Sequence, residues 1–396
     1  NRWQPLSLEY SIAQNGIPLP DNTQRFLGSH WGNVTPFALT RASSSDVYND
    51  PGAPPMLADS GDQEFKDAIL RVILFSSYMD PSDGIYIDIS PLTKGNNTLG
   101  SNDGNGRFIN PKTNLPYMVQ IKKRGDYHRI LAEFWADGPD SETPPGHWNT
   151  LANYVSDHAL TEKRLQGAGN LLSDLEWDIK LYFALNASLH DAAIATWDAK
   201  AKYDYVRPIT AIRYMGGLGQ SSDVNGPSYH ENGLPLAFGL VEVITAATTM
   251  SIGKHHHLAG HEGEIAIRGW KGNPSDPHNS YSGVGWIRAV EWLPYQRETF
   301  VTPPFAGYTS GHSGFSRAAA EVLTSFTGDE FFPGGLGVFT AKKDDYLEFE
   351  IGPSEDIQLQ WASYYDAADE AGLSRISGGI HVDADDLKGR EIGAKA

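Results

Sequence analysis

The chain has 396 residues, of which 40% are hydrophobic and 11% aromatic, so it can bury a large core and is not an intrinsically disordered protein. It contains no cysteine, which excludes disulfides and thiolate chemistry, and no apolar run near the roughly 18 residues of a membrane span. Its net charge of −18 argues against nucleic acid as a partner, since proteins that bind nucleic acid present basic faces.

The first 60 residues are rich in Pro, Asn, Ser and Gly, so we predict an extended arm (residues 1–60) that packs on a single α-helical domain (residues 61–396). Beyond the arm, apolar residues recur at three- and four-residue steps, which indicates helices. The predicted helices begin near residue 61 and then cover 126–136, 147–160, 170–200, a segment from Pro208, 236–250, 311–326, 354–373 and the tail after His381.

Alternating residues at 346–351, with a short stretch from Gly337 before them, predict one hairpin. The expected fold class is therefore mainly α, a helical-bundle protein with at most a minor β-hairpin.

Three segments, far apart in the sequence, carry the residues that indicate function. The first is Lys200-Ala-Lys-Tyr-Asp-Tyr-Val-Arg207-Pro208. Lys200 and Arg207 are seven residues apart, so they share a face if the helix continues between them. Pro208 is suited to the first turn of a following helix.

The second segment is Tyr308-Thr-Ser310-Gly311-His312, at a predicted helix start. Unpaired N–H groups and the positive end of the helix dipole favour an anion there. Ser310 adds a hydroxyl donor, and Gly311 lets the backbone approach a ligand closely.

The third segment runs from Ser374 to Asp385. Arg375 offers a planar guanidinium that fits two oxygens of an oxyanion. His381 and Asp385 are four residues apart, which lets the carboxylate orient the imidazole.

Together the segments supply three cations, a hydroxyl and amide pair, and two histidines, a set that suits a tetrahedral or trigonal-bipyramidal oxyanion. Each segment alone is common on protein surfaces or at helix caps, so it is their combination that predicts an anion site. A positive site in an acidic protein also helps to capture an anion. A non-catalytic anion-binding protein is one alternative, but it would leave His312 without a role.

The patterns Lys-x6-Arg-Pro, Ser-Gly-His and Ser-Arg-x3-Gly-x-His-x3-Asp together resemble the signature shared by vanadium-dependent haloperoxidases and type-2 phosphatidic acid phosphatases. One position departs from it, because the family usually has Pro before Ser-Gly-His and this chain has Thr309. The resemblance implies vanadate as the cofactor. Its oxygens would be held by Lys200, Arg207, Ser310, Gly311 and Arg375.

By the same resemblance, His381 would be the axial ligand of vanadium, or in a phosphatase the nucleophile that takes the phosphoryl group. His312 would be the acid–base residue, and Lys200 would donate to hydrogen peroxide and make it electrophilic. The implied activity is oxidation of halide by hydrogen peroxide to hypohalous acid or its equivalent, which halogenates small organic molecules.

Three features favour the haloperoxidase branch over an acid phosphatase that works through a phosphohistidine. Nearly 200 residues precede Lys200, whereas the phosphatases are commonly compact. Trp197 and Phe305 resemble the aromatic pocket lining of the haloperoxidases, with plain core packing as the alternative. Residues 133–148 resemble a stretch typical of the same branch, and by that match Asp137 would pair with Arg375.

The halide is less clear from the sequence. Phe305 stands where bromide-preferring algal relatives tend to carry His, and relatives with Phe include chloride- and iodide-oxidising enzymes. We expect iodide and bromide activity and leave chloride open.

A few other features carry weaker expectations. Histidines 255–257 and His261 include an i, i+4 pair, but no firm helix is predicted there, so we do not expect a metal site. The chain begins at Asn1, and we expect a removed leader and a secreted or periplasmic location. The oligomeric state is left open, a homo-oligomer included.

Overall fold

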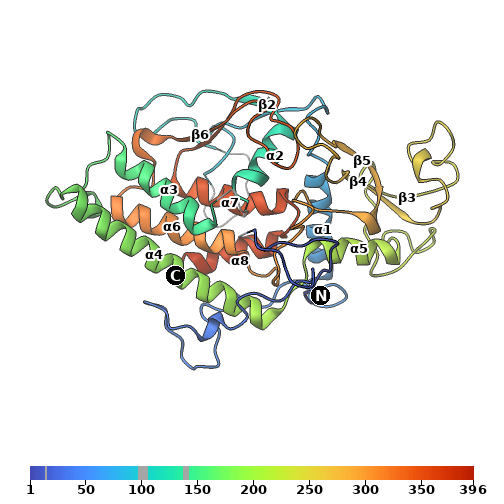
Figure 1. Cartoon of the computed structure of the whole chain (residues 1–396), viewed down its shortest axis with the longest axis horizontal. Helices are drawn as coiled ribbons and strands as arrows, with labels where there is room; N and C mark the ends of the chain where they lie inside the picture. The colour runs from blue at the N-terminus through green and yellow to red at the C-terminus, as the bar shows by residue number, and fades with distance from the viewer. Residues whose placement is uncertain (14–15, 97–105, 137–141) are drawn as a thin grey trace.

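The computed structural model describes residues 1–13, 16–96, 106–136 and 142–396, and within these ranges it is a bundle of helices with three small sheets (Figure 1). The α-helices are α1 (Asp62–Ser76), α2 (Arg124–Phe134), α3 (Pro144–Asp157), α4 (Asp174–Tyr203), α5 (Pro208–Leu218), α6 (Gly311–Thr327), α7 (Tyr364–Ser377) and α8 (Asp383–Gly393). Short 3-10 helices are η1 (Trp31–Asn33), η2 (Leu165–Gly167), η3 (His256–Leu258), η4 (Ala289–Glu291) and η5 (Pro333–Gly335).

All three sheets are antiparallel. They pair β1 (Tyr86–Asp88) with β2 (Ile121–Lys123), β4 (Ile265–Trp270) with both β3 (Val241–Val243) and β5 (Val284–Arg288), and β6 (Gly337–Ala341) with β7 (Ile357–Trp361). The mainly α class is confirmed, and the described residues contain three small sheets where the sequence predicted one hairpin. None of the described helices has the length and hydropathy needed to traverse a bilayer.

Helix α6 lies inside the bundle and packs against α3, α4, α7 and α8. Ser310 caps its start by accepting a hydrogen bond from the Ser313 amide, and residues 311–320 are all buried. A Cβ on Gly393 would lie 2.3 Å from the Gly314 carbonyl oxygen, so α8 approaches α6 this closely only because residue 393 has no side chain. The first turn of α8 also contacts the start of α6, where the Ser310 amide donates to the Asp385 carbonyl at 2.8 Å.

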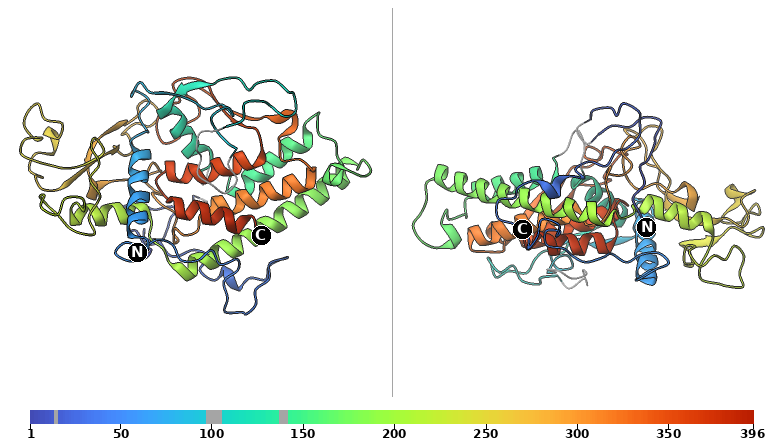
Figure 2. Two further views of the ribbon diagram at one scale, coloured as in Figure 1. Left: turned by 180° about the vertical axis from the view of Figure 1, so that it is seen from behind. Right: turned by 90° about the horizontal axis from the view of Figure 1, so that it is seen from below.

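The N-terminal residues lie along α4 (Figures 1 and 2). The buried Asp191 carboxylate of α4 accepts hydrogen bonds from the amides of three consecutive residues, Phe37, Ala38 and Leu39, at 2.7, 2.7 and 3.1 Å. A carboxylate with three amide donors is a strong attachment point, because its buried charge is fully hydrogen-bonded. The division into an arm (1–60) and one domain (61–396) stays a prediction.

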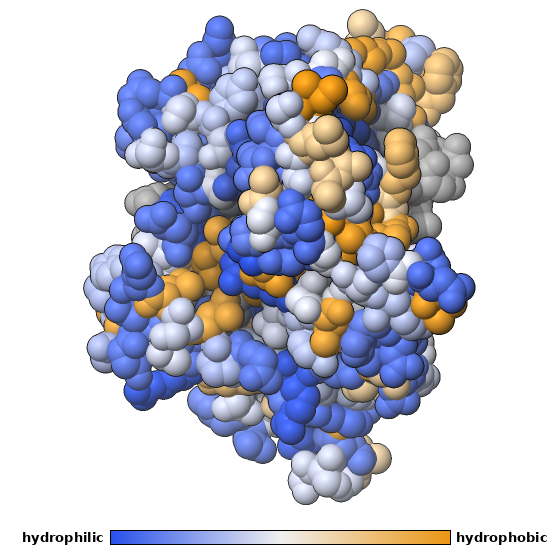
Figure 3. Space-filling view, turned by 90° about the vertical axis from the view of Figure 1, so that its right-hand side faces the viewer, coloured by the Kyte–Doolittle hydropathy of each residue, from blue (hydrophilic) through white to orange (hydrophobic). Residues whose placement is uncertain are grey.

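The predicted helix over residues 236–250 is wrong, because this segment forms turns and strand β3. Gly239 has a φ of 75°, which interrupts a helix, and the branched Val241 and Val243 favour a strand. The sheet built on β3 projects at one end of the molecule, beyond α1 and α5 (Figure 2). Hydrophilic residues cover most of this end, with separate hydrophobic patches between them (Figure 3).

The predicted helix over residues 354–373 is correct only in its second half. Residues Ile357–Trp361 form β7, with buried side chains at alternate positions, and α7 begins after Ser363, which forms a capping box with Asp366. Strand β7 pairs with β6, so residues 346–351 are not the second strand of the hairpin.

Candidate active site

Lys200 and Arg207 reach the same place from different backbone elements. Helix α4 ends at Tyr203, Asp204 takes a left-handed conformation (φ 45°), and Arg207 is extended. The helix therefore does not continue between the two cations as the sequence suggested. Pro208 begins α5, as predicted.

One loop, residues 303–310, binds both cations. The Lys200 ammonium donates to the carbonyls of Ala306 at 2.7 Å and Gly307 at 2.9 Å, and Arg207 Nε donates to the Phe305 carbonyl at 2.8 Å. Both cations are buried, and their contacts here are carbonyl oxygens, which orient a positive charge without neutralising it.

His381 lies next to Arg207 in the loop between α7 and α8. Its Nδ1 is 2.8 Å from Asp385 Oδ2, and its Nε2 is 3.1 Å from Arg207 Nη1. Since a carboxylate accepts and a guanidinium donates, the proton belongs on Nδ1 and the lone pair on Nε2. The predicted pair of His381 and Asp385 is thus in hydrogen-bonding contact.

The start of α6 forms another wall of the site. Gly311 faces Trp197, and a Cβ there would lie 3.3 Å from the indole ring, so the position favours the smallest residue. The first amides of a helix have no acceptor within that helix and carry the positive end of its dipole. The Gly311 amide is therefore a candidate donor for an anion. The Ser310 amide is used by the Asp385 carbonyl, so Ser310, which also caps the helix, can contribute its hydroxyl hydrogen.

His312 and Arg375 complete the cluster. His312 Nε2 is 2.6 Å from the Trp135 carbonyl oxygen, which can only accept, so Nε2 carries the proton. Arg375 is buried and donates through Nη2 to the Ala132 carbonyl at 2.6 Å. Asp137, the predicted partner of Arg375, lies outside the described residues, so that pairing stays a prediction.

The electrostatics of this cluster, which we call the anion site (Lys200, Arg207, Ser310, Gly311, His312, Arg375 and His381), favour a negative ligand. Burial and the charge of Arg207 hold the pKa of Lys200 well below its ordinary value, and burial lowers the pKa of Arg207 to about 9. Burial, with nearby cations, lowers the pKa of both histidines, which are therefore neutral. Among the described residues, Asp385 is the carboxylate whose charge opposes both Lys200 and Arg207.

The anion site opens into a cavity of about 400 Å³, which both histidines line. Phe305 lines the cavity and lies against both cations, with its ring centroid 5.1 Å from Lys200 Nζ and 5.2 Å from Arg207 Cζ. Trp197 packs beside Phe305 with ring centroids 4.9 Å apart. Both predicted aromatics thus line the cavity.

Sequence reasoning missed several residues of this cavity. Trp31, from the N-terminal residues, lines it with Pro144 and Pro145 at the start of α3. Trp135 supplies the carbonyl that fixes His312, and it lies in the stretch 133–148 that the resemblance had already singled out. Nothing local in the sequence around Trp31 would have indicated its place.

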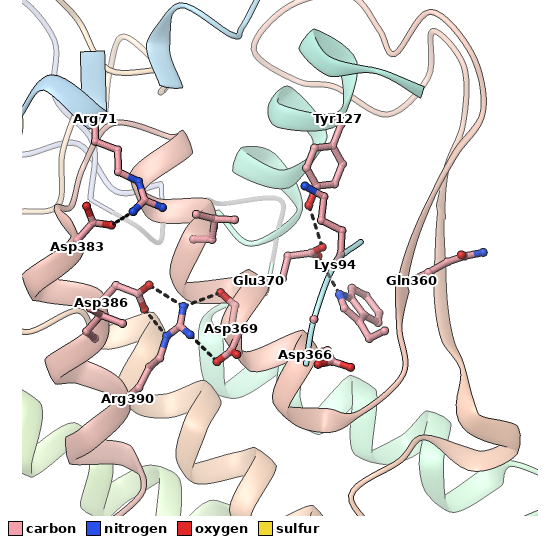
Figure 4. Close-up of a pocket in the computed structure, with 14 residues that line it drawn as sticks. Arg71, Lys94, Tyr127, Gln360, Asp366, Asp369, Glu370, Asp383, Asp386 and Arg390 are labelled. Carbon is pink, nitrogen blue, oxygen red and sulfur yellow. Dashed lines mark hydrogen bonds and ion pairs between the residues drawn. The ribbon is translucent and has the colours of Figure 1, made fainter. Parts of the chain in front are cut away.

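A second pocket, the charged pocket, has a volume of about 220 Å³ between α7, α8 and the segment at Lys94 (Figure 4). Its arginines are matched by carboxylates: Arg390 with Asp386 and Asp369, both at 2.7 Å, and Arg71 with Asp383 at 2.9 Å. Glu370, another acidic residue of this pocket, accepts hydrogen bonds from the indole groups of Trp361 at 2.9 Å and Trp135 at 3.2 Å.

The histidines at 255–257 and His261 each contact a protein group. His255 Nδ1 lies 3.0 Å from Thr248 Oγ1, and His261 pairs with Glu264 at 2.8 Å. Across the described part of the chain, no group of three or more potential metal-binding side chains is found.

A family model described as the VCPO second helical-bundle domain matches residues 180–396, more than half of the chain. This range contains every predicted site residue except Asp137. No curated protein matches the sequence.

Solved structures share the fold. An apo-type bacterial vanadium-dependent chloroperoxidase has a TM-score of 0.58 and 16% identity, with all of this chain and 60% of that chain covered. Its holo-type counterpart has a TM-score of 0.55 and 17% identity, with 100% and 59% covered. A homohexameric vanadate-dependent bromoperoxidase from Ascophyllum nodosum has a TM-score of 0.50 and 12% identity, with 94% and 69% covered. The chain thus spans about 60% of the length of the chloroperoxidases it matches.

A helical bundle with the buried side chains of Lys200, Arg207 and Arg375 in the same cluster as a neutral histidine is an α-helical protein with a candidate oxyanion site. The family match makes this specific: the chain belongs to the vanadium haloperoxidase family.

Proposed function

We propose that this protein is a vanadate-dependent haloperoxidase, which oxidises halide with hydrogen peroxide and passes the oxidised halogen to small organic molecules. The observation that carries the proposal is the burial of two cations, Lys200 and Arg207, beside His381, with carbonyl oxygens and a neutral imidazole as their hydrogen-bond partners. The fold shared with vanadium-dependent chloroperoxidases and a bromoperoxidase supports it.

The residues of the anion site fit vanadate. Arg207 Nη2 is buried and has no hydrogen-bond partner within the described residues, a costly arrangement that an oxygen of an anion would relieve. His381 Nε2 is unprotonated and accepts from Arg207 Nη1 at 3.1 Å, and an unprotonated ring nitrogen is what a metal ligand needs. His381 would ligate the vanadium. The vanadate oxygens would be held by Lys200, Arg207, Ser310, Gly311 and Arg375.

Vanadate, when bound, supplies a Lewis acid that activates hydrogen peroxide at constant oxidation state. His312 is neutral, with its proton on Nε2, so its Nδ1 lone pair can take a proton from hydrogen peroxide. Lys200 uses two ammonium hydrogens on carbonyls, and for the third there is no acceptor among the residues described. We assign that hydrogen to the peroxide oxygen, which it would make more electrophilic. Asp385 keeps the Nδ1 proton on His381.

The overall reaction balances as hydrogen peroxide, halide and one proton giving hypohalous acid and water. We propose iodide and bromide as halides and leave chloride open. A homo-oligomer is in keeping with the homohexamer formed by the Ascophyllum enzyme. A secreted or periplasmic location remains part of the proposal.

Halogenation of monochlorodimedone, with vanadate, hydrogen peroxide and each halide in turn, tests the function. We expect bromination that requires added vanadate and is lost in His381→Ala. Triiodide formation should show the same two dependences. Absence of oxidation of any halide by protein that has been shown to bind vanadate would overturn the proposal.

An acid phosphatase is the second candidate, because phosphate has the shape and charge that the same donors fit. Hydrolysis of p-nitrophenyl phosphate, blocked by vanadate and accompanied by no halogenation, would favour it. The two assays on one preparation therefore separate the candidates.

A further inference from the structure

The N-terminal residues supply one wall of the active-site cavity. Trp31 of η1 lines the cavity and packs against Trp197 of α4, with ring centroids 5.7 Å apart and planes tilted by 38°. The two indoles form a corner rather than a parallel stack. Trp31 is still 38% exposed, so an apolar surface is left in contact with solvent at the mouth of the cavity.

This wall is fixed by hydrogen bonds on both sides of Trp31. The Leu27 amide donates to the Pro304 carbonyl at 3.0 Å, and the Leu27 carbonyl accepts from Trp197 Nε1 at 2.9 Å. Gly28 follows in a left-handed conformation (φ 72°), where a Cβ would lie 2.6 Å from the Trp197 ring. Further along, Asp191 anchors the amides of residues 37–39. The position of Trp31 is thus set by backbone contacts rather than by its own side chain.

Apolar residues make up most of the remaining lining of the cavity. They include Pro144 and Pro145 at the start of α3, and Phe305 and Phe315. The cavity volume of about 400 Å³ lies within the range of small-molecule sites, roughly 300–1,000 Å³. His312 and His381 are the ionisable residues of the lining.

We propose that this cavity binds a flat aromatic molecule, with its ring against the corner of Trp31 and Trp197 and a polar substituent toward His312. Rings of this kind gain from offset or edge contacts with indole, whereas a puckered aliphatic ring of equal size does not. Trp31 is then a specificity-determining residue, which selects the organic substrate. The proposal names the substrate class of the proposed haloperoxidase and rests on that function for the chemistry, but the binding itself does not depend on it.

Equilibrium dialysis of 2-naphthol and of decahydro-2-naphthol against the whole chain, with no vanadate, halide or peroxide, tests the binding. The two ligands share a carbon skeleton and a hydroxyl group, and they differ in flatness and aromaticity. We expect 2-naphthol to bind about tenfold more tightly, the size of effect that an aromatic contact provides. Equal affinity for the two ligands would overturn the proposal.

Two variants of Trp31 test whether this residue causes the preference for the aromatic ligand. Trp31→Ala should weaken 2-naphthol binding about tenfold and leave decahydro-2-naphthol nearly unchanged, and Trp31→Phe should restore most of the loss. Phe37→Ala is the matched control, since Phe37 is an exposed aromatic nearby in the chain that packs on Phe183 and does not line the cavity.

The thermal unfolding midpoint of Trp31→Ala should match that of the control, because backbone contacts hold this segment. Unchanged 2-naphthol binding in a folded Trp31→Ala variant would overturn the role of Trp31. A protein that binds 2-naphthol but oxidises no halide would refute the proposed function and leave the aromatic site standing. Halide oxidation without 2-naphthol binding would support the proposed function and refute the aromatic site.

Discussion

The anion site and the charged pocket are both rich in buried charge, but their arginines have different kinds of partner. In the charged pocket, Arg390 is paired with two carboxylates and Arg71 with one (Figure 4). In the anion site, Arg207 contacts carbonyl oxygens and a neutral histidine, and one of its nitrogens has no partner among the described residues. A buried charge that is paired within the protein needs no ligand, although removing one partner is costly, whereas a buried charge without a counter-charge indicates a ligand of opposite sign.

The largest expected effect is on vanadate affinity in His381→Ala. Removal of the proposed ligand should reduce affinity about 1,000-fold or more, equivalent to about 4 kcal/mol, and abolish halide oxidation. Equilibrium dialysis with vanadate gives the affinity. His257→Ala is a suitable control, because that histidine contacts the Trp286 carbonyl, away from the anion site. Tight vanadate binding by His381→Ala would mean that the ligand assignment is wrong.

Arg390→Met, in the charged pocket, should lower the free energy of unfolding and leave vanadate affinity nearly unchanged. It leaves Asp369 and Asp386 as buried carboxylates without their partner, which costs about 3–5 kcal/mol of unfolding free energy. Vanadate affinity of the folded variant should stay within a few-fold of the original. Urea unfolding monitored by tryptophan fluorescence measures the change, and a loss below about 1 kcal/mol would show that these ion pairs are not structural.

Arg207→Met should reduce vanadate affinity but not stability, the opposite of Arg390→Met. We expect vanadate affinity to fall about 100-fold, because charge-assisted hydrogen bonds to the anion are lost. The unfolding free energy without vanadate should be unchanged or higher, since an unbalanced buried charge is removed. If this variant is destabilised as much as Arg390→Met, the contrast between the two sites fails.

The sequence predicted the helices well where periodicity was strong and poorly where two patterns competed. In α4, the spacing of apolar residues predicts a buried face that runs from Leu175 and Ile179 to Leu185 and Leu189. The last two are buried, but Leu175 and Ile179 are 72% and 62% exposed, and at that end of the helix Trp177 and Leu181 are fully buried instead. Both sets repeat every four residues, so periodicity alone cannot choose between them. The choice is made by packing against α6, which is a long-range contact.

The anion site could be predicted almost completely because a short pattern carries each part of it. The geometry of the site could not be predicted. Lys200 and Arg207 do not share a helix face; instead, both donate hydrogen bonds to the loop at residues 303–310. The place of Trp31 in the cavity was missed because it also depends on long-range contacts. Trp31 packs against Trp197, 166 residues further along the chain, and the nearby hydrogen bond from Trp197 to the Leu27 carbonyl spans 170 residues.

The smallest expected effect concerns the pH dependence of stability at the charged pocket. Burial raises the pKa of Glu370 from its ordinary 4.5 to about 7, so the folded state holds this proton more tightly than the unfolded state. The stability that this group contributes is complete below about pH 4.5 and is lost as pH rises through about 7, a decline of about 1–3 kcal/mol.

Glu370→Gln tests this decline without removing the acceptor that Trp135 and Trp361 use. The amide does not titrate, so the unfolding free energy of the variant should fall less between pH 5 and pH 7.5 than that of the original protein. Urea unfolding at the two pH values gives both slopes. Because Trp135 also binds His312, vanadate affinity should be compared at the same time, and it should not change. If the unfolding free energy of the two proteins falls equally between the two pH values, Glu370 is already ionised in the folded protein at pH 5. Its negative charge would then be compensated by the surrounding groups.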